Sequence, residues 1–266
     1  MIPEMSDAER AILVTDAIVY QLEYELDSFW GWTPNDLAGY GPLAWPSLFD
    51  NRQWRQRGIR FAVSQFVPVW SRQTTKLGNS DRESVDLLNS YNDGGFAIGP
   101  DVWFLPAAEG SYRDGIRNVR LYQENLLAGN TGRASVNITT RNLVVVMRAL
   151  SEDVLGEPYG RLIERNSQLG WLQLDNEVYR AQGAAIVARD VLAAITVGWY
   201  DELVERQVIE NLEQAIDSLD AATHFNPLFI MRGDGDSMIA DHRSKMARYI
   251  SEAQNRINEA VLALES

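Results

Sequence analysis

Cysteine is absent from the 266-residue sequence. Disulfide bonds, thiolate nucleophiles, iron–sulfur clusters and cysteine-ligated zinc are therefore excluded. Histidine occurs only as His224 and His242, which leaves few residues for a serine triad or a histidine-based metal centre. The GxSxG, HExxH and Walker-lysine motifs are missing as well. We therefore expect no metal ion and no cofactor, and the motifs name no catalytic residue.

Basic residues are in the minority: 24 Lys and Arg stand against 37 Asp and Glu, a net charge of −13. This excess of negative charge repels phosphate backbones and anionic lipid surfaces, so nucleic acid is not an expected partner. The sequence also lacks an uncharged apolar run of the roughly 18–20 residues that a membrane helix requires. Its first residues, MIPEMSDAER, lack the basic flank and apolar stretch of a signal peptide. We expect a soluble chain without a membrane span.

Apolar residues make up 45% of the chain, and in its second half they recur at alternating spacings of three and four positions. This spacing places them on one face of an α-helix. Three such stripes are Val136, Thr140, Leu143, Met147, Leu150 and Val154; Val178, Ala181, Ala185, Ala188, Leu192, Ile195 and Trp199; and Ile239, His242, Met246, Tyr249, Ala253, Ile257, Ala260 and Leu264. Strand signals are short, the best being 228–231 and 102–105. The sequence predicts an all-α protein, an elongated antiparallel helical bundle with long ordered loops and at most a few short strands.

Local signals indicate where the helices start and end. Ser6 with Glu9 and Ser80 with Glu83 have the pattern of capping boxes, and Gly129 is a natural C-terminal glycine. Pro158 should interrupt the helix that starts near 136, and Pro68 should kink the helix that contains it. The helices expected from these signals and stripes cover about 6–30, 51–76, 80–92, 107–129, 136–156, 178–199, 203–222 and 239–264.

The chain is expected to form a single helical domain over residues 1–266, since no repeat or low-complexity tract divides it. Residues 30–51 are rich in Trp, Pro and Gly, which breaks the helical periodicity and predicts a long ordered loop. Residues 226–237 are expected to form a second loop before the C-terminal helix, and residues 167–176 to separate two helices.

The stretch MRGDGDSMIADHRSKM, residues 231–246, is rich in glycine and acid. An EF-hand calcium loop needs glycine at its sixth position, but the sixth residue counted from Asp234 is Ile239. A dinucleotide-binding loop needs a third glycine where Met238 stands, and its acids would face an anionic pyrophosphate. We interpret the stretch as the start of the last helix, with its acids near the helix N-terminus and His242 on the apolar seam.

Two aromatic clusters are candidates for binding a ligand or a partner. In the loop, Trp32 lies near Asn35 and Asp36, and aromatic faces beside amides and acids are typical of sugar-binding grooves. The second cluster combines Glu109, Tyr112 and Arg113 at an expected helix start. The alternative interpretation is structural: the aromatic residues pin the long loop to the bundle, Glu109 interacts with the helix dipole, and Arg113 holds a buried carboxylate.

Five segments carry a resemblance to a known family: GWTPND (31–36), WFLPAAEGSYRDGI (103–116), TTRNL (139–143), VYRAQG (178–183) and NPLFIMRGDGDSMIADHRSKMARYIS (226–251). In this order they span almost the whole chain and resemble the bacterial domain-of-unknown-function family 2333. Members of that family typically carry one N-terminal membrane helix before a helical domain, and no activity is established for them. The sequence departs from that pattern, since no membrane helix is expected here. The resemblance implies a location at the bacterial cell envelope, facing the periplasm and associated with the inner membrane, and supplies no catalytic residues.

Three functions stay open. The helical stripes, the missing motifs and the resemblance favour a non-catalytic helical module of the envelope that binds a protein partner. The alternative is a carboxylate-based hydrolase, or a binding protein, for cell-wall carbohydrate that uses the Trp-rich loop; spacing in the sequence cannot show which of the 37 acids would form a catalytic pair. The third is a small-ligand binding protein with a pocket between helices.

Overall fold

The computed structural model describes residues 5–34, 46–75, 83–92, 94–100, 108–163, 171–225 and 242–266, without the side chains of 46–50 and 171–174. Within these ranges the chain forms helices and no strand, which confirms the predicted all-α class. Both predicted strands, 102–105 and 228–231, lie outside the described residues. The elements are α1 (Asp7–Asp27), α2 (Pro46–Thr74), α3 (Val85–Tyr91), the 3-10 turn η2 (Gly95–Ala97), α4 (Ala108–Leu127), α5 (Thr140–Ala149), the π turn η3 (Leu150–Val154), α6 (Gly156–Ile163), α7 (Trp171–Gly198), α8 (Tyr200–Glu205), α9 (Ile209–Thr223) and α10 (His242–Glu265).

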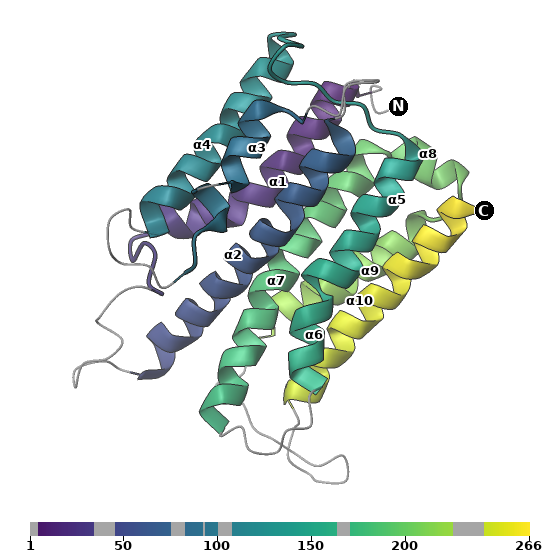
Figure 1. Ribbon diagram of the computed structural model, residues 1–266. Helices are drawn as coiled ribbons and strands as arrows, with labels where there is room; N and C mark the ends of the chain where they lie inside the picture. The colour runs from purple at the N-terminus through teal and green to yellow at the C-terminus, as the bar shows by residue number, and fades with distance from the viewer. Residues whose placement is uncertain are drawn as a thin grey trace.

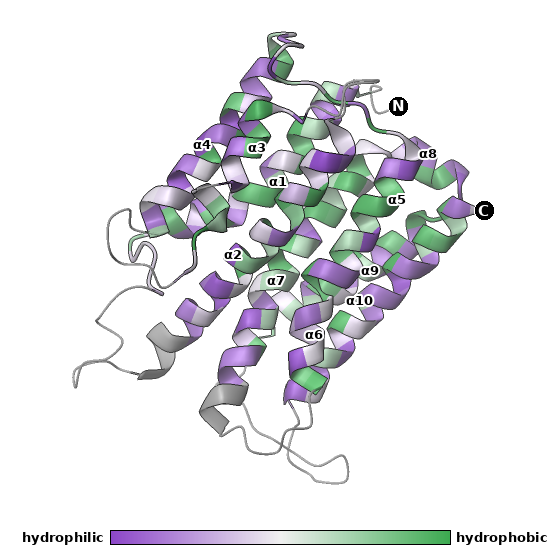
Figure 2. Cartoon of the chain, in the orientation of Figure 1, coloured by the Kyte–Doolittle hydropathy of each residue, from purple (hydrophilic) through white to green (hydrophobic). Residues whose placement is uncertain are grey.

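The long helix α7 lies in the middle of the molecule, with the other long helices around it (Figure 1). Helices α2, α9 and α1 pack along α7, α4 packs on α1, and α10 packs against α9, α5 and α6. Helices α1 and α4 therefore lie at one edge and α10 at the opposite edge (Figure 1). Buried apolar residues from Ala11 to Leu264 form one hydrophobic cluster, and hydrophilic residues gather on the outer faces of α4 and α10 (Figure 2).

Reciprocal hydrogen bonds close the start of α1. The Ser6 backbone N–H donates to Glu9 Oε2 at 2.8 Å, and the Glu9 backbone N–H donates to Ser6 Oγ at 3.3 Å. This confirms the capping box predicted there. The same exchange between Thr139 and Asn142 starts α5. Each pair satisfies amide groups that have no partner inside the helix.

The predicted capping box of Ser80 and Glu83 does not describe the start of α3. Ser80 lies outside the described residues, and α3 starts at Val85 after Ser84. The Glu83 carboxylate instead accepts hydrogen bonds from the hydroxyls of Ser71 and Tyr91. The Glu83 side chain therefore contacts α2 and does not cap α3.

Two helices begin earlier than predicted. Helix α2 begins at Pro46, inside the predicted loop 30–51, because proline suits the first position of a helix, where its missing N–H costs nothing. It continues through Pro68 to Thr74. Helix α7 begins at Trp171, so part of the predicted separator 167–176 is helical.

The helix predicted over 203–222 is two helices, α8 and α9. Gln207 has φ +57°, its N–H donates to the Val204 carbonyl, and the Val208 N–H donates to the Leu203 carbonyl. These bonds form a Schellman ending, in which the left-handed residue is usually glycine. Gln207 gave no such signal in the sequence, so the prediction of one continuous helix is wrong.

The interruption predicted near Pro158 occurs just before it, in the π turn η3 and at Leu155. A wide turn leaves backbone carbonyls without their usual helical partners. Gln254 of α10 donates from Nε2 to the Ser151 carbonyl at 2.6 Å and so ties this turn to the last helix. Pro158 lies in the first turn of α6, where proline is tolerated.

Glycines let α2 and α7 touch backbone to backbone. A Cβ atom on Gly58 would lie 2.0 Å from the Arg180 carbonyl oxygen, and one on Gly183 would lie 2.1 Å from the Arg55 carbonyl oxygen. Real Cβ atoms do not approach other atoms so closely. No other residue fits at either position without separating the two helices.

Residues Asp175–Gly198 of α7 form the one described helix that is long and apolar enough to cross a membrane by length and composition. Most of this segment is buried inside the protein against α2, α1 and α9. A core helix of a globular protein has the same length and composition, so these properties alone do not identify a membrane span.

We predict that Gly183→Ala lowers the free energy of unfolding by at least about 2–3 kcal/mol, because the new methyl group must push α2 away from α7. Gly160→Ala is the matched control: a Cβ at this α6 position would meet nothing within 4 Å. It should leave stability unchanged or raise it by up to about 1 kcal/mol. Urea denaturation of the three proteins measures both effects. Equal stability of Gly183→Ala and the wild type would contradict the close backbone contact between α2 and α7.

Candidate functional site

Most of the predicted site residues gather where the C-terminal end of α1 meets the N-terminal end of α4. Trp32 lies just after α1, and Glu109, Tyr112 and Arg113 lie on the first two turns of α4. The two predicted clusters touch, since the rings of Trp32 and Tyr112 meet edge to face with centroids 4.9 Å apart. The other two predicted residues, Asn35 and Asp36, lie outside the described residues.

The inner layer of this junction consists of Trp32 and Tyr112, which are both buried. Trp32 Nε1 donates to the Pro100 carbonyl at 3.2 Å, and Tyr112 Oη donates to the Ile98 carbonyl at 3.0 Å. Each ring therefore has an apolar body in the core and a satisfied polar tip. Their faces are not open to a sugar, and their contacts are those of the loop-pinning interpretation.

A buried carboxylate, which the sequence motifs did not indicate, lies between α1 and α2. Glu25 of α1 is 4% exposed, and its carboxylate accepts hydrogen bonds of 2.9 Å from Arg52, Arg55 and Gln56 of α2. A buried carboxylate needs such partners to offset the loss of water. The spacing from Leu22 already placed Glu25 on the buried face of α1, and this was the signal available in the sequence.

Gln56 connects this ion pair to the chain after α1. Its Oε1 accepts hydrogen bonds from the Thr33 backbone N–H at 2.9 Å and the Thr33 hydroxyl at 2.7 Å. Its Nε2 donates to the Gly31 carbonyl at 2.9 Å as well as to Glu25. Residues 31–33 are thereby fixed against α2.

The outer layer of the junction is exposed and aromatic. Phe29 is 91% exposed and Trp30 is 55% exposed, and their rings meet edge to face at 5.1 Å. We call Phe29, Trp30, Trp32 and Tyr112 the aromatic corner. Its two outer rings face solvent, while its two inner rings join the core.

Charged residues join α1 and α4 at the same junction. Arg113 donates to Asp27 Oδ1 at 2.6 Å and to the Leu26 carbonyl at 2.9 Å, and it approaches Glu109 at 3.6 Å. The hydrogen bond with Asp27 raises the pKa of the Arg113 guanidinium above its ordinary value, so this residue stays charged. Arg113 joins α4 to the last turn of α1 rather than to the buried carboxylate that the structural alternative foresaw.

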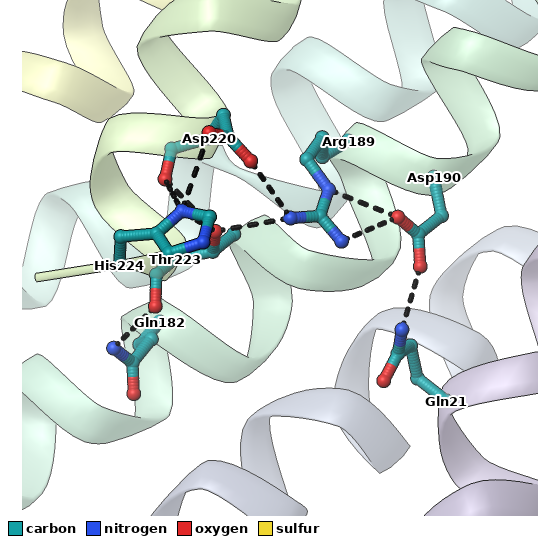
Figure 3. A network of polar contacts seen from close by, with 7 residues as sticks. All are labelled: Gln21, Gln182, Arg189, Asp190, Asp220, Thr223 and His224. Carbon is teal, nitrogen blue, oxygen red and sulfur yellow. Dashed lines mark hydrogen bonds and ion pairs between the residues drawn. The ribbon is translucent and has the colours of Figure 1, made fainter.

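A second polar network joins α1, α7 and α9 (Figure 3). Arg189 donates to Asp190 Oδ1 from both Nε and a terminal nitrogen, and to Asp220 Oδ1 at 2.9 Å. Asp190 Oδ2 accepts a hydrogen bond of 2.8 Å from Gln21 of α1. Although burial lowers the pKa of Arg189, the bonds with both aspartates raise it above the ordinary value overall. Both acids are paired with this one guanidinium.

His224 and Thr223 lie in the same network, at the end of α9 (Figure 3). His224 Nδ1 is 3.2 Å from Asp220 Oδ2 and 3.3 Å from the Thr223 hydroxyl. Both contacts lie on the same ring nitrogen, whereas a catalytic triad places the acid and the nucleophile on opposite nitrogens of the histidine. The Thr223 hydroxyl donates to the Asp220 carbonyl at 2.8 Å, so its proton already has an acceptor. His224 is also well exposed. The group fixes the end of α9 and does not form an activated nucleophile.

One pair of acids lies between α6 and α7, the arrangement that a carboxylate hydrolase would need. Arg161 bridges the pair, at 2.5 Å from Glu157 and 3.5 Å from Glu177. Arg180 adds a contact of 3.0 Å to Glu157. Burial raises the pKa of Glu177 above its ordinary value despite the attraction of Arg161 and Arg180. Each acid is held by arginine, whereas a general acid must face its substrate.

The described residues contain no group of three or more His, Asp or Glu side chains that could hold a metal ion. His242 begins α10 and is half-buried, with its ring edge to face on Phe225 at 5.5 Å. His242 therefore packs against Phe225, just after α9, and lies at the edge of the apolar face that the sequence predicted for this helix. Residues 231–241 of the glycine-rich stretch lie outside the described part of the chain.

We predict that Glu25→Ala lowers the free energy of unfolding by about 3–5 kcal/mol, because Arg52 and Gln56 lose a buried acceptor. Asp27→Ala is the matched control, since its ion pair with Arg113 is about half exposed. It should cost no more than about 1 kcal/mol. Chemical denaturation at neutral pH compares the two variants, and equal losses would contradict the supporting role of Glu25.

We predict a pH-dependent effect for Glu177→Gln. Because the folded-state pKa of Glu177 is raised, the folded protein holds this proton more tightly than the unfolded chain, and ionisation costs stability as the pH rises. Glutamine has the same shape and does not ionise. The stability of the variant relative to the wild type should therefore increase between about pH 4 and pH 7. Denaturation curves at both values test this, and a constant or falling difference would contradict it.

Comparison with known proteins agrees with the resemblance found in the ordered segments. No curated protein and no solved structure matches the chain. Residues 151–265 match the model of a family described as "Uncharacterized protein conserved in bacteria (DUF2333)". The VYRAQG segment lies inside this range, as does 226–251, while the three earlier segments lie before it. Over residues 151–265 the chain therefore matches the bacterial family DUF2333, as the ordered segments predicted.

Proposed function

We propose that this protein is a non-catalytic helical module of the bacterial cell envelope that binds a protein partner through the aromatic corner. The observation that carries the proposal is the exposure of Phe29 and Trp30, 91% and 55%, at the end of α1. Tryptophan and other large aromatic residues dominate the energetic centres of protein interfaces. A large aromatic side chain that is fully exposed can remove roughly 150–250 Å² from water on binding.

The support beneath the outer rings favours tight binding. Gln56 holds the backbone at Gly31 and Thr33, directly after Trp30, and the buried carboxylate of Glu25 holds Gln56. A surface that is rigid before binding loses less conformational entropy when a partner docks. The ion pair of Arg113 and Asp27 at the rim would contribute to orientation more than to affinity.

The state of the polar groups supports a non-catalytic role. The carboxylates of Glu25, Glu157, Asp190 and Asp220 each accept bonds from arginine in the described part of the chain. A general acid must be able to reach its substrate, whereas these carboxylates are engaged by arginine side chains. The envelope location rests on the resemblance to the family, of which the comparison itself supports the bacterial origin.

Site-specific photo-cross-linking in the producing bacterium tests the proposal. A photoreactive amino acid in place of Phe29 should trap a discrete protein partner, whereas the same probe at Leu127, which is 71% exposed at the far end of α4, should not. With the purified partner, the double variant Phe29→Ala/Trp30→Ala should bind at least tenfold more weakly, or about 1.4 kcal/mol. Leu127→Ala should bind like the wild type.

The alternative, binding of cell-wall carbohydrate, is favoured by the exposed ring of Trp30 and the acids Asp27 and Glu109 nearby. Titration with soluble peptidoglycan fragments, followed by tryptophan fluorescence, distinguishes the two. Saturable binding that Trp30→Ala abolishes, together with no cross-linked protein at position 29, would replace the proposal by the alternative. Equal cross-linking at positions 29 and 127 would refute a specific site at the corner.

A further inference from the structure

An open groove of about 540 Å³ runs between α6 and α10. Helix α10 lies at the edge of the molecule opposite α1 and α4 (Figure 1). Tyr159 and Ile163 line it from α6, and Ala247 and Ser251 are among the residues that line it from α10. Small side chains at these α10 positions allow another helix to approach closely. Ile163 is 46% exposed, so the groove leaves an apolar side chain in water.

Four charged residues of α10 also line the groove: Arg248, Glu252, Arg256 and Glu259. At 100° per residue they fall within about 80° of one another around the helix axis, on one flank. Along the helix their charges alternate in the order positive, negative, positive, negative. Such a row is complementary to itself when a second helix with the same row runs in the opposite direction.

We propose that the groove between α6 and α10 is a two-fold interface in which a second copy of this chain docks its own α10 antiparallel to the first. In this arrangement Arg248 faces Glu259 of the copy, and Glu252 faces Arg256 of the copy. Two-fold symmetry repeats both pairs, which gives four ion pairs around an axis near residue 254. In an antiparallel helix pair the same flank of each helix meets its counterpart, so charges on a single flank are what this geometry requires.

The contacts that these residues make within one chain leave them able to form the proposed ion pairs with a second copy. Arg256 makes a 3.0 Å pair with Glu259 of the same turn, but Glu259 is about half exposed, and such pairs contribute little. Arg248 lies over the Tyr249 ring. Leu262, which is 65% exposed one turn beyond Glu259, comes opposite the start of the copy's α10, near the copy's Ile163. Two exposed apolar residues are thereby covered at each end of the interface, whereas a parallel copy would place like charges together.

Charge reversal of the full-length chain tests the interface by light scattering and sedimentation. The wild type should be a dimer, and Glu252→Arg or Arg256→Glu alone should weaken dimerisation at least tenfold, since each places like charges opposite one another twice. The double variant should restore it. Glu213→Arg, an exposed charge reversal on α9, is the control and should remain dimeric. Circular dichroism confirms that each variant is folded.

Cross-linking gives a second readout that does not depend on charge. Because the chain contains no cysteine, Asn255→Cys introduces a single thiol beside the expected axis. Mild oxidation should link two copies through it, and Glu213→Cys should stay unlinked. A monomeric wild type at the highest concentration tested, or a double charge variant that does not recover, would overturn the proposal. The inference is independent of partner binding at the aromatic corner, since none of these variants touches α1 or α4.

Discussion

The backbone contact between α2 and α7 determines where the other parts of this protein lie. Helices with side chains at their crossing are normally held about 8–10 Å apart. At Gly58 and Gly183 the missing side chains let each helix reach the carbonyl groups of the other. Helix α7 is also the element against which α1 and α9 pack, so a shift of α2 relative to α7 would be transmitted through the whole core. The crossing allows little adjustment, because carbonyl oxygens and not flexible side chains form the contact.

Two ion-pair networks begin at this crossing. The Arg55 carbonyl faces Gly183, while the Arg55 side chain reaches Glu25 and so contributes to the support of the aromatic corner. The Arg180 carbonyl faces Gly58, while the Arg180 side chain reaches Glu157 of α6. Each arginine thus contributes its backbone to the crossing and its guanidinium to a different neighbouring helix.

This geometry gives a physical account of the VYRAQG segment, residues 178–183. Gly183 allows the close approach of α2, and Gln182 donates hydrogen bonds of 2.9 Å to the Thr223 and Phe225 carbonyls at the end of α9. Arg180 holds α6. This segment, one of the five that carry the family resemblance, is therefore explained by packing between four helices. It does not need a catalytic role to account for its residue types.

The sequence predicted the helices well where the information was local. The three-and-four spacing gave the buried faces of α7, of α10 and, from Leu143 onward, of α5, although α5 starts at Thr140 and not near 136; the capping box of Ser6 and Glu9 gave the start of α1. It failed where a tertiary contact or an unusual residue decided the outcome, as with Gln207 in a left-handed turn and Glu83 bonded to Ser71. Residue type alone indicated the aromatic residues of the candidate site, and no spacing in the sequence could show that Trp32 contacts Tyr112. Glu25 was missed because a charged residue on an apolar stripe is identified only once its partners on another helix are known.

The two proposed surfaces are compatible because they lie at opposite edges of the molecule. Pairing through α6 and α10 would leave α1 and α4 of each copy facing away from the two-fold axis (Figure 1). A dimer would then present two aromatic corners. A partner that is itself dimeric, or that is repeated along an envelope structure, could engage both corners at once. Its second contact would be intramolecular, and avidity can then exceed the affinity of one site by about 10²–10⁴-fold where the spacing of the sites permits. Charge reversal at Glu252 would then weaken binding to such a partner without touching the aromatic corner, through loss of the second contact alone.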